Sequence, residues 1–123
     1  ERIRELIARW DAPVVLDGYG PAGSLLDAIE GAGVHVEKLS SRQVANACGV
    51  FYDAVSDRKL QIRRHDLLDE AIAAARRRTS GDSWSWARSD TSADISPLVA
   101  ITLAYERAAS NRANGAEAWV AWD

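Results

Sequence analysis

The chain has 123 residues, of which 47% are hydrophobic and 27% are charged, and its formal net charge is -3. This length fits one domain with a sizeable core, and the composition excludes a disordered protein. No apolar run approaches the length of a membrane span, so we expect no membrane partner. The acidic balance excludes a molecule-wide cationic field, so any nucleic-acid contact must use local patches.

The cysteine and methionine content bears on the cellular compartment of the protein and on the extent of the chain. The single cysteine, Cys48, lies in an apolar helical stretch. It excludes an internal disulfide and a multi-cysteine zinc site, and we expect a small buried residue in a reducing, cytoplasmic compartment. There is no methionine, even at position 1, so we expect a piece of a longer protein.

The first half of the chain predicts a parallel α/β unit. After an amphipathic helix over residues 2–10, the apolar run 14–16 predicts a short strand buried on both faces. Asp17 ends this strand, a glycine-containing turn follows over 18–20, and a helix extends over about 22–31. Ligands in such sheets bind beyond the carboxyl ends of the strands, so Asp17 is placed at the binding edge.

A second strand and a long helix come next. Residues 34–39 alternate apolar and polar side chains, which predicts a strand parallel to the first, with His35 in solvent. Ser40 and Gln43 have capping-box spacing, so a helix is expected from residue 41 to about Asp57. Its predicted buried face comprises Val44, Ala47, Cys48, Phe51 and Val55.

The next segment predicts a strand, a helix and a second strand. Residues 60–63 are a short strand candidate, and Asp66 is expected to cap a helix that the arginine run 76–78 closes. The expected buried face of that helix comprises Leu67, Leu68, Ala71, Ile72 and Ala75. After a turn at 81–83, residues 84–88 predict a strand that pairs with 60–63 and packs both tryptophans on one face. Phosphate contact by the arginine run and base stacking by the tryptophans are the alternatives.

A final helix is expected from Pro97 to about Ala109. Asp94 is spaced to head the stripe of this helix that faces the sheet, which also holds Leu98, Ile101, Tyr105 and Ala108. Asp17 and Asp94 are therefore candidate ligands of divalent metal, an ion that drives phosphodiester cleavage. The alternatives are a turn residue for Asp17 and a first-turn carboxylate for Asp94. Helix caps and solvated faces explain the further acidic candidates Asp27, Glu30 and Asp90.

Three stretches carry a resemblance to a known family: residues 14–20, the alternating segment that ends at Leu39, and residues 94–104, which begin Asp-Ile-Ser-Pro-Leu-Val-Ala. Over most of residues 1–110 the chain resembles the carboxyl-terminal nuclease domain of the large terminase subunit of tailed bacteriophages. The resemblance implies a ribonuclease H-like α/β fold with a mixed sheet and flanking helices. It also implies Mg²⁺- or Mn²⁺-dependent cleavage of concatemeric double-stranded DNA during genome packaging, with Asp17 and Asp94 as catalytic metal ligands.

The chain departs from this family at its start, because the first three strands and the aspartate on them are absent. We therefore expect a domain truncated at its N-terminus, inactive alone, whose exposed sheet edges favour a homodimer. In the intact protein the resemblance implies an ATPase motor domain, with the portal and the small terminase subunit as partners. The setting would be the cytoplasm of a phage-infected or prophage-carrying bacterium, and residues 111–123 would form a tail.

Arginines near the predicted edge supply candidate phosphate contacts, namely Arg63, Arg64 and Arg88. Two functions outside catalysis stay open. One is a binding module in which the glycine turn holds a small anionic ligand. The other is an assembly module of a phage or prophage protein, in which Trp119, Trp122 and the sheet edge mediate docking.

Overall fold

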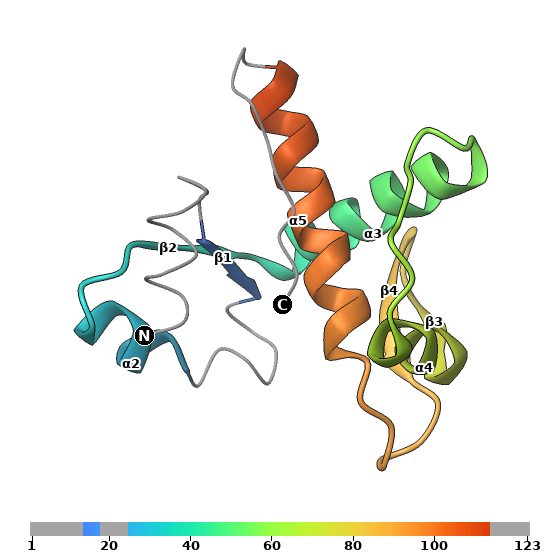
Figure 1. The fold of residues 1–123 in the computed structure, drawn as a ribbon, viewed down its shortest axis with the longest axis horizontal. Coiled ribbons are helices and arrows are strands. Elements are labelled where there is room, and N and C mark those ends of the chain that lie inside the picture. The colour runs from blue at the N-terminus through green and yellow to red at the C-terminus, as the bar shows by residue number, and fades with distance from the viewer. Residues whose placement is uncertain (1–13, 18–24, 114–123) are drawn as a thin grey trace.

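The computed structural model describes residues 14–17 and 25–113, and these form a mixed α/β structure of small sheets and flanking helices (Figure 1). In chain order the elements are β1 (Val14–Asp17), α2 (Leu26–Gly31), β2 (Val36–Leu39), α3 (Ser41–Ser56), α4 (Asp66–Ala74), β3 (Ala75–Ser80), β4 (Ser83–Arg88) and α5 (Ser96–Ala113). Helix α5 runs through the middle, with the β1–β2 pair on one side and α4 and the β3–β4 pair on the other. The predicted α/β class is confirmed. None of the described helices is long and apolar enough to cross a membrane.

The parallel pairing predicted for the first two strands is confirmed. Strand β1 pairs with β2 in parallel, and Asp17 lies opposite Leu39. The four residues of β1 are half-buried, however, rather than buried on both faces as predicted. A two-stranded sheet is the reason, because within the described residues β1 has a hydrogen-bonded neighbour on one side alone. The predicted helix over 2–10 and the glycine turn lie outside the described residues.

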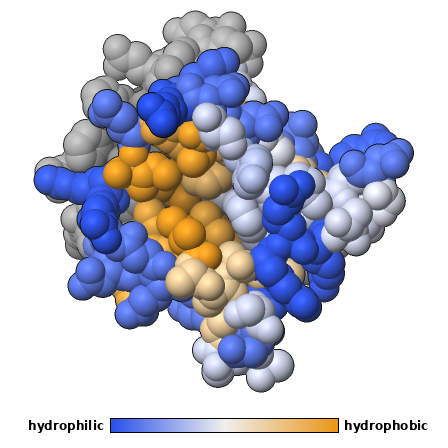
Figure 2. All heavy atoms as spheres, turned by 90° about the vertical axis from the view of Figure 1, so that its right-hand side faces the viewer, coloured by the Kyte–Doolittle hydropathy of each residue, from blue (hydrophilic) through white to orange (hydrophobic). Residues whose placement is uncertain are grey.

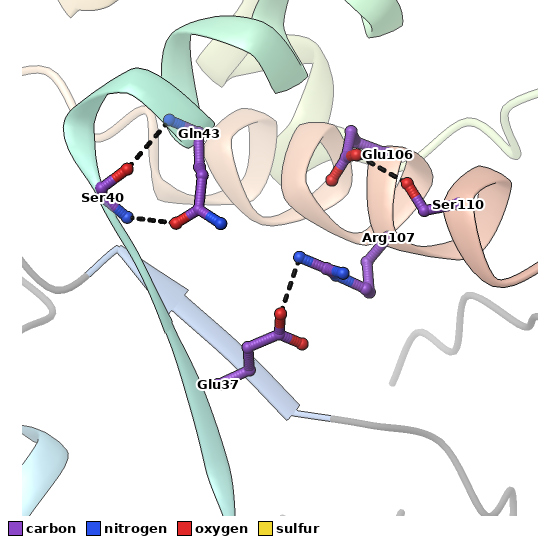
Figure 3. Close-up of polar contacts among 6 residues, drawn as sticks. All are labelled: Glu37, Ser40, Gln43, Glu106, Arg107 and Ser110. Atoms are coloured by element: carbon purple, nitrogen blue, oxygen red, sulfur yellow. Dashed lines mark hydrogen bonds and ion pairs between the residues drawn. The ribbon is translucent and has the colours of Figure 1, made fainter.

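Helix α3 begins and ends where the sequence predicts. The Ser40 side chain accepts a hydrogen bond from the Gln43 amide at 3.2 Å, and the Ser40 amide donates to Gln43 Oε1 at 2.8 Å (Figure 3). The helix ends before Asp57. Of its predicted buried face, Ala47, Cys48 and Phe51 are buried, whereas Val55 is 45% exposed and Ala54 is buried instead.

The predicted strand over residues 60–63 is wrong, and so is its pairing with 84–88. These residues have no regular structure, and β4 pairs instead with β3 in antiparallel register. A loop of Gly81 and Asp82 joins the two strands, with Gly81 at a φ of 61°. Glycine at the first position of a two-residue loop suits a tight hairpin turn, which pairs β4 with the residues just before it in the chain.

The arginine run therefore does not close α4. Helix α4 ends at Ala74, and Arg76, Arg77 and Arg78 all lie in β3. The N-terminal cap also differs, since the His65 side chain, rather than Asp66, accepts a hydrogen bond from the Leu67 amide at 3.1 Å. Of the five residues expected on the buried face of this helix, Leu68 and Ala71 are buried, whereas Leu67 and Ile72 are more than half exposed.

Helix α5 packs against both halves of the structure. One core cluster comprises Phe51, Leu68, Ala71, Leu98 and Ile101, and the other comprises Leu39, Ala47 and Leu103. The far end of α5 is tied to β2 by an ion pair between Arg107 Nη2 and Glu37 Oε1 at 2.8 Å (Figure 3). The Nε atom of Arg107 is buried without a hydrogen-bond partner in the described part of the chain. Because α5 contributes to both clusters, it fixes the two small sheets relative to each other.

A buried polar contact joins α5 to the hairpin. Thr102 is 1% exposed, and its hydroxyl donates to the Leu98 carbonyl at 2.7 Å and accepts from Trp86 Nε1 at 3.1 Å. A buried indole N–H needs such an acceptor, because leaving it unpaired costs the desolvation of the donor. This contact therefore helps to hold β4 against α5.

Replacing Thr102 with valine tests this contact. Valine keeps the shape but removes the acceptor, so we expect Thr102→Val to lower the free energy of unfolding by about 1–3 kcal/mol. Urea unfolding followed by tryptophan fluorescence measures the change. Thr102→Ser, which keeps the hydroxyl, is expected to lose clearly less. Equal losses in the two variants would show that packing of the methyl group, and not the hydrogen bond, matters here.

Candidate functional site

Asp17 lies at the carboxyl end of β1, as predicted, and next to the core. Burial raises the pKa of the Cys48 thiol on α3, and the negative charge of Asp17 raises that pKa further. A hydrogen bond with the backbone of Trp86 acts in the opposite direction. The carboxylate of Asp17 is therefore close enough to influence a thiol that lies between α3 and the hairpin.

Asp94 is not on the sheet-facing stripe of the last helix, so this part of the prediction is wrong. Helix α5 begins at Ser96, and Asp94 is exposed in front of it. Its Oδ1 accepts a hydrogen bond from the Ser96 amide at 2.9 Å. Pro97 in the first turn lets the helix begin here, and a short carboxylate just before the first turn satisfies one of the otherwise unpaired amides.

A second carboxylate and an arginine share this loop. Asp90 accepts hydrogen bonds from the amide and the hydroxyl of Ser92, and Arg88 Nη1 donates to the Thr91 carbonyl at 3.3 Å. Hydrogen bonds from Ser92 and from Ser96 hold the pKa values of Asp90 and Asp94, respectively, below their usual range, and the positive charge of Arg88 lowers both further. Both carboxylates are thus ionised at neutral pH, and Arg88 lies at the base of the hairpin beside them.

These two carboxylates give the protein an acid-sensitive loop. The pKa of each carboxyl is lower in the folded state than in the unfolded state, so the ionised form stabilises the fold. This contribution is present above the ordinary pKa of 3.8 and is lost as the pH falls through the depressed pKa. We expect the melting temperature to fall with pH in this acid range, and to fall less in the Asp90→Asn/Asp94→Asn variant. Thermal unfolding followed by circular dichroism at a series of pH values measures the difference. Identical pH profiles would contradict the proposed role of these hydrogen bonds.

Strand β1, which ends at Asp17, contacts helix α5, and Asp94 lies two residues before that helix. Val15 of β1 and Val99 of α5 each pack against the cluster of Leu39, Ala47 and Leu103. In Figure 1 the carboxyl end of β1 points toward α5. No cluster of three or more His, Cys, Asp or Glu residues able to hold a metal occurs within residues 14–17 and 25–113. Two carboxylates suit Mg²⁺ or Mn²⁺ in their chemistry, because Mg²⁺ is commonly held by one or two carboxylates together with waters and substrate phosphates.

Of the arginines predicted to contact phosphate, two lie in the segment between α3 and α4. Arg63 is exposed there, and Arg64 forms an ion pair with Asp69 of α4, with 3.1 Å between Nη2 and Oδ2. An exposed pair of this kind contributes little to stability. Neither residue lies on the β3–β4 hairpin, which carries Arg88 and the arginine run 76–78.

An aromatic–arginine stack on the hairpin was not predicted. The guanidinium carbon of Arg77 lies 4.4 Å from the centre of the Trp84 ring and 5.0 Å from that of Tyr52. Trp84 also makes edge-to-face contacts with Tyr52 and Trp86, at centroid distances of 5.7 and 4.9 Å. The alternation of Trp84 and Trp86 predicted their shared face, but Tyr52 comes from α3 and only the tertiary structure brings it to them.

One face of the molecule also carries an apolar area. Figure 2 shows hydrophilic side chains over much of this face, beside one continuous apolar region. Exposed large apolar side chains on α3 and α4 include Val55, Leu67 and Ile72, which are 45%, 58% and 51% exposed. Larger apolar patches on soluble domains commonly mark interaction sites.

Comparisons with protein-family models, with curated proteins and with solved structures gave no significant match. The resemblance to a terminase nuclease and the ribonuclease H-like fold therefore stay predictions. The function has to be argued from the residues of this chain.

Proposed function

We propose that this chain is part of a metal-dependent nuclease that cleaves double-stranded DNA, of the kind found in the large terminase subunit of tailed phages. What supports the proposal is the position of Asp17 at the end of a strand, together with the resemblance of residues 14–20 and 94–104 to that family. Asp17 ends a parallel strand, and that strand packs against the helix that Asp94 precedes. The carboxyl ends of parallel strands are where such folds bind their ligands.

In this proposal Asp17 and Asp94 hold a divalent ion, Mg²⁺ or Mn²⁺, through carboxylate oxygens. The ion, when bound, activates water and stabilises the charge that develops on the phosphodiester. Asp94 is ionised at neutral pH like any exposed aspartate, and hydrogen bonds from Ser96 with the nearby charge of Arg88 lower its pKa further. Its Oδ1 is held by the Ser96 amide, which fixes the direction in which the other oxygen points.

The wider setting follows from the same resemblance. In the intact protein the nuclease works beside an ATPase motor domain, with the portal and the small terminase subunit as partners. The setting is the cytoplasm of a phage-infected or prophage-carrying bacterium. Two carboxylates give a divalent ion few protein ligands, so we expect metal binding by these 123 residues to be weak.

Calorimetric titration with Mn²⁺ tests the proposed ligands without needing activity. We expect weak binding by the wild type, loss of that binding in Asp17→Asn, and unchanged binding in Asp27→Asn. Asp27 is a suitable control because it is an exposed aspartate on α2. No binding by the folded wild type, or equal binding by Asp17→Asn, would contradict the metal site.

The exposed apolar side chains favour a second candidate function, an assembly module. Leu67 and Ile72 are each more than half exposed on α4. Self-association through this face predicts a concentration-dependent sedimentation coefficient that Leu67→Ser/Ile72→Ser abolishes. A monomer at all concentrations would remove the homodimer. Trp119 and Trp122, which the sequence suggested for docking, lie outside the described residues.

A further inference from the structure

Two arginines on the outward face of the hairpin make no ion pair or side-chain hydrogen bond with the described part of the chain. Arg76 and Arg78 alternate with residues that pack inward, and they lie opposite Ala87 and Ser85 of β4. Both are exposed, and no carboxylate of the described residues pairs with either. The helix dipole cannot account for them, because α4 ends at Ala74 and no basic residue lies in its last turn.

The hairpin is a local concentration of positive charge. Between Ala75 and Arg88 it carries four arginines and one aspartate, which gives a net charge of +3 in a chain whose total is -3. Small side chains surround the outward arginines, because their cross-strand neighbours are serine and alanine. A cationic two-stranded ribbon with small neighbouring side chains can approach a phosphate backbone closely, and the major groove of duplex DNA admits such a ribbon.

The third arginine of the run has a different role. Arg77 points to the other face, where its guanidinium stacks on Trp84 and Tyr52 and so connects the hairpin to α3. The opposite orientations follow from the alternation of side chains along a strand. Arg77 thus holds the ribbon in place, whereas its two neighbours are available to a ligand.

The aromatic contacts also bear on the kind of nucleic acid. Single-stranded nucleic acid is bound chiefly through bases stacked on aromatic rings. Here Arg77 covers the faces of Trp84 and Tyr52, and Trp84 and Trp86 are in edge-to-face contact. The ribbon therefore offers charge rather than a stacking platform, which suits the backbone of a duplex.

We propose that the outward face of the β3–β4 hairpin is a DNA-contact surface on which Arg76 and Arg78 bind backbone phosphates of duplex DNA. The choice of DNA rests on the proposed function, whereas the location rests on the hairpin itself. None of the residues of this surface is a proposed metal ligand, so we expect it to bind DNA without a metal ion. It favours the alternative that the sequence left open for the arginine run 76–78, and it assigns phosphate contact to two residues of that run rather than to Arg63, Arg64 or Arg88.

Fluorescence anisotropy with a labelled duplex of about 30 base pairs, in EDTA and over a series of KCl concentrations, tests this surface. We expect Arg76→Gln/Arg78→Gln to bind at least tenfold more weakly, with a salt dependence of log K that is shallower by about 2, since each phosphate contact contributes about 0.9. The Arg42→Gln/Arg58→Gln variant removes the same charge from exposed positions off the hairpin and should change affinity less than twofold. Wild-type affinity and salt dependence in the hairpin variant, or equal losses in both variants, would overturn the proposal.

Further experiments identify the ligand and distinguish the DNA-contact proposal from the nuclease proposal. Arg76→Lys/Arg78→Lys should keep most of the salt dependence, because lysine also neutralises phosphate. Tighter binding of a single strand of the same length, or equal competition by polyglutamate, would overturn the assignment to duplex DNA. If Mn²⁺ fails to bind while the hairpin variant still loses DNA, the nuclease proposal fails and the DNA-contact surface stands.

Discussion

Replacing Asp94 with asparagine is expected to abolish metal-dependent cleavage and to leave the fold intact. The asparagine side-chain oxygen can accept the Ser96 amide hydrogen bond as Asp94 does, and the two residues are about equal as helix caps. The negative charge that a divalent ion needs is lost, so we expect cleavage to fall on the order of 100-fold or more. The measurement is Mn²⁺-dependent cleavage by the intact protein, with melting temperature measured on the same samples.

Two comparisons make this result specific. Asp90→Asn changes a carboxylate of the same loop that also accepts from a serine amide, and it should cleave like the wild type. Asp94→Ala should lose both cleavage and about 1 kcal/mol of stability, because it removes the cap as well. If Asp94→Asn cleaves like the wild type, Asp94 is a helix cap and nothing more.

Phe51→Ala is expected to cause the largest loss of stability. Phe51 is 4% exposed, belongs to the cluster of Leu68, Leu98 and Ile101, and contacts the Tyr105 ring edge-to-face at 6.2 Å. Truncating a buried phenylalanine costs about 3–5 kcal/mol, which is a large part of the stability of a small domain. Urea unfolding followed by circular dichroism measures the loss.

A valine one turn further along the same helix provides the control. Val55 was expected in the core with Phe51, but it is 45% exposed. Val55→Ala should therefore change the free energy of unfolding by no more than about 0.5 kcal/mol, because exposed positions tolerate substitution. A loss of several kcal/mol in Val55→Ala would mean that this face of α3 is buried, as the sequence predicted.

Features with a local cause were predictable from the sequence. The capping pair of Ser40 and Gln43 set the start of α3, and Pro97 marked the first turn of α5. The alternation of Trp84 and Trp86 identified β4. Each of these signals acts within a few residues, so tertiary contacts elsewhere in the chain do not override it.

Where local preference and tertiary pairing favour different structures, the sequence did not predict the outcome. Arginine favours helices, so the run 76–78 read as the end of α4, yet the tight turn at Gly81 draws these residues into β3 as the partner of β4. The segment 60–63 has strand-like residues but no partner strand, and it stays irregular.

The candidate site was predicted in part. Asp17 lies at the end of its strand as expected, because the apolar run and the following glycines define that end. The spacing of Asp94 matched the stripe of α5, but the helix begins two residues later and leaves the carboxylate in solvent as a cap. The stack of Arg77 on Tyr52 and Trp84 joins residues far apart in sequence, and no local pattern indicates it.

Cleavage of supercoiled plasmid in Mn²⁺ tests the central claim most directly. The assay compares wild type and Asp17→Asn, each as the intact protein, with EDTA as the metal-free control. The account predicts nicked and linear products from the wild type, none in EDTA, and none from Asp17→Asn. Equal cleavage by both proteins, or no cleavage by a folded wild type, would contradict it.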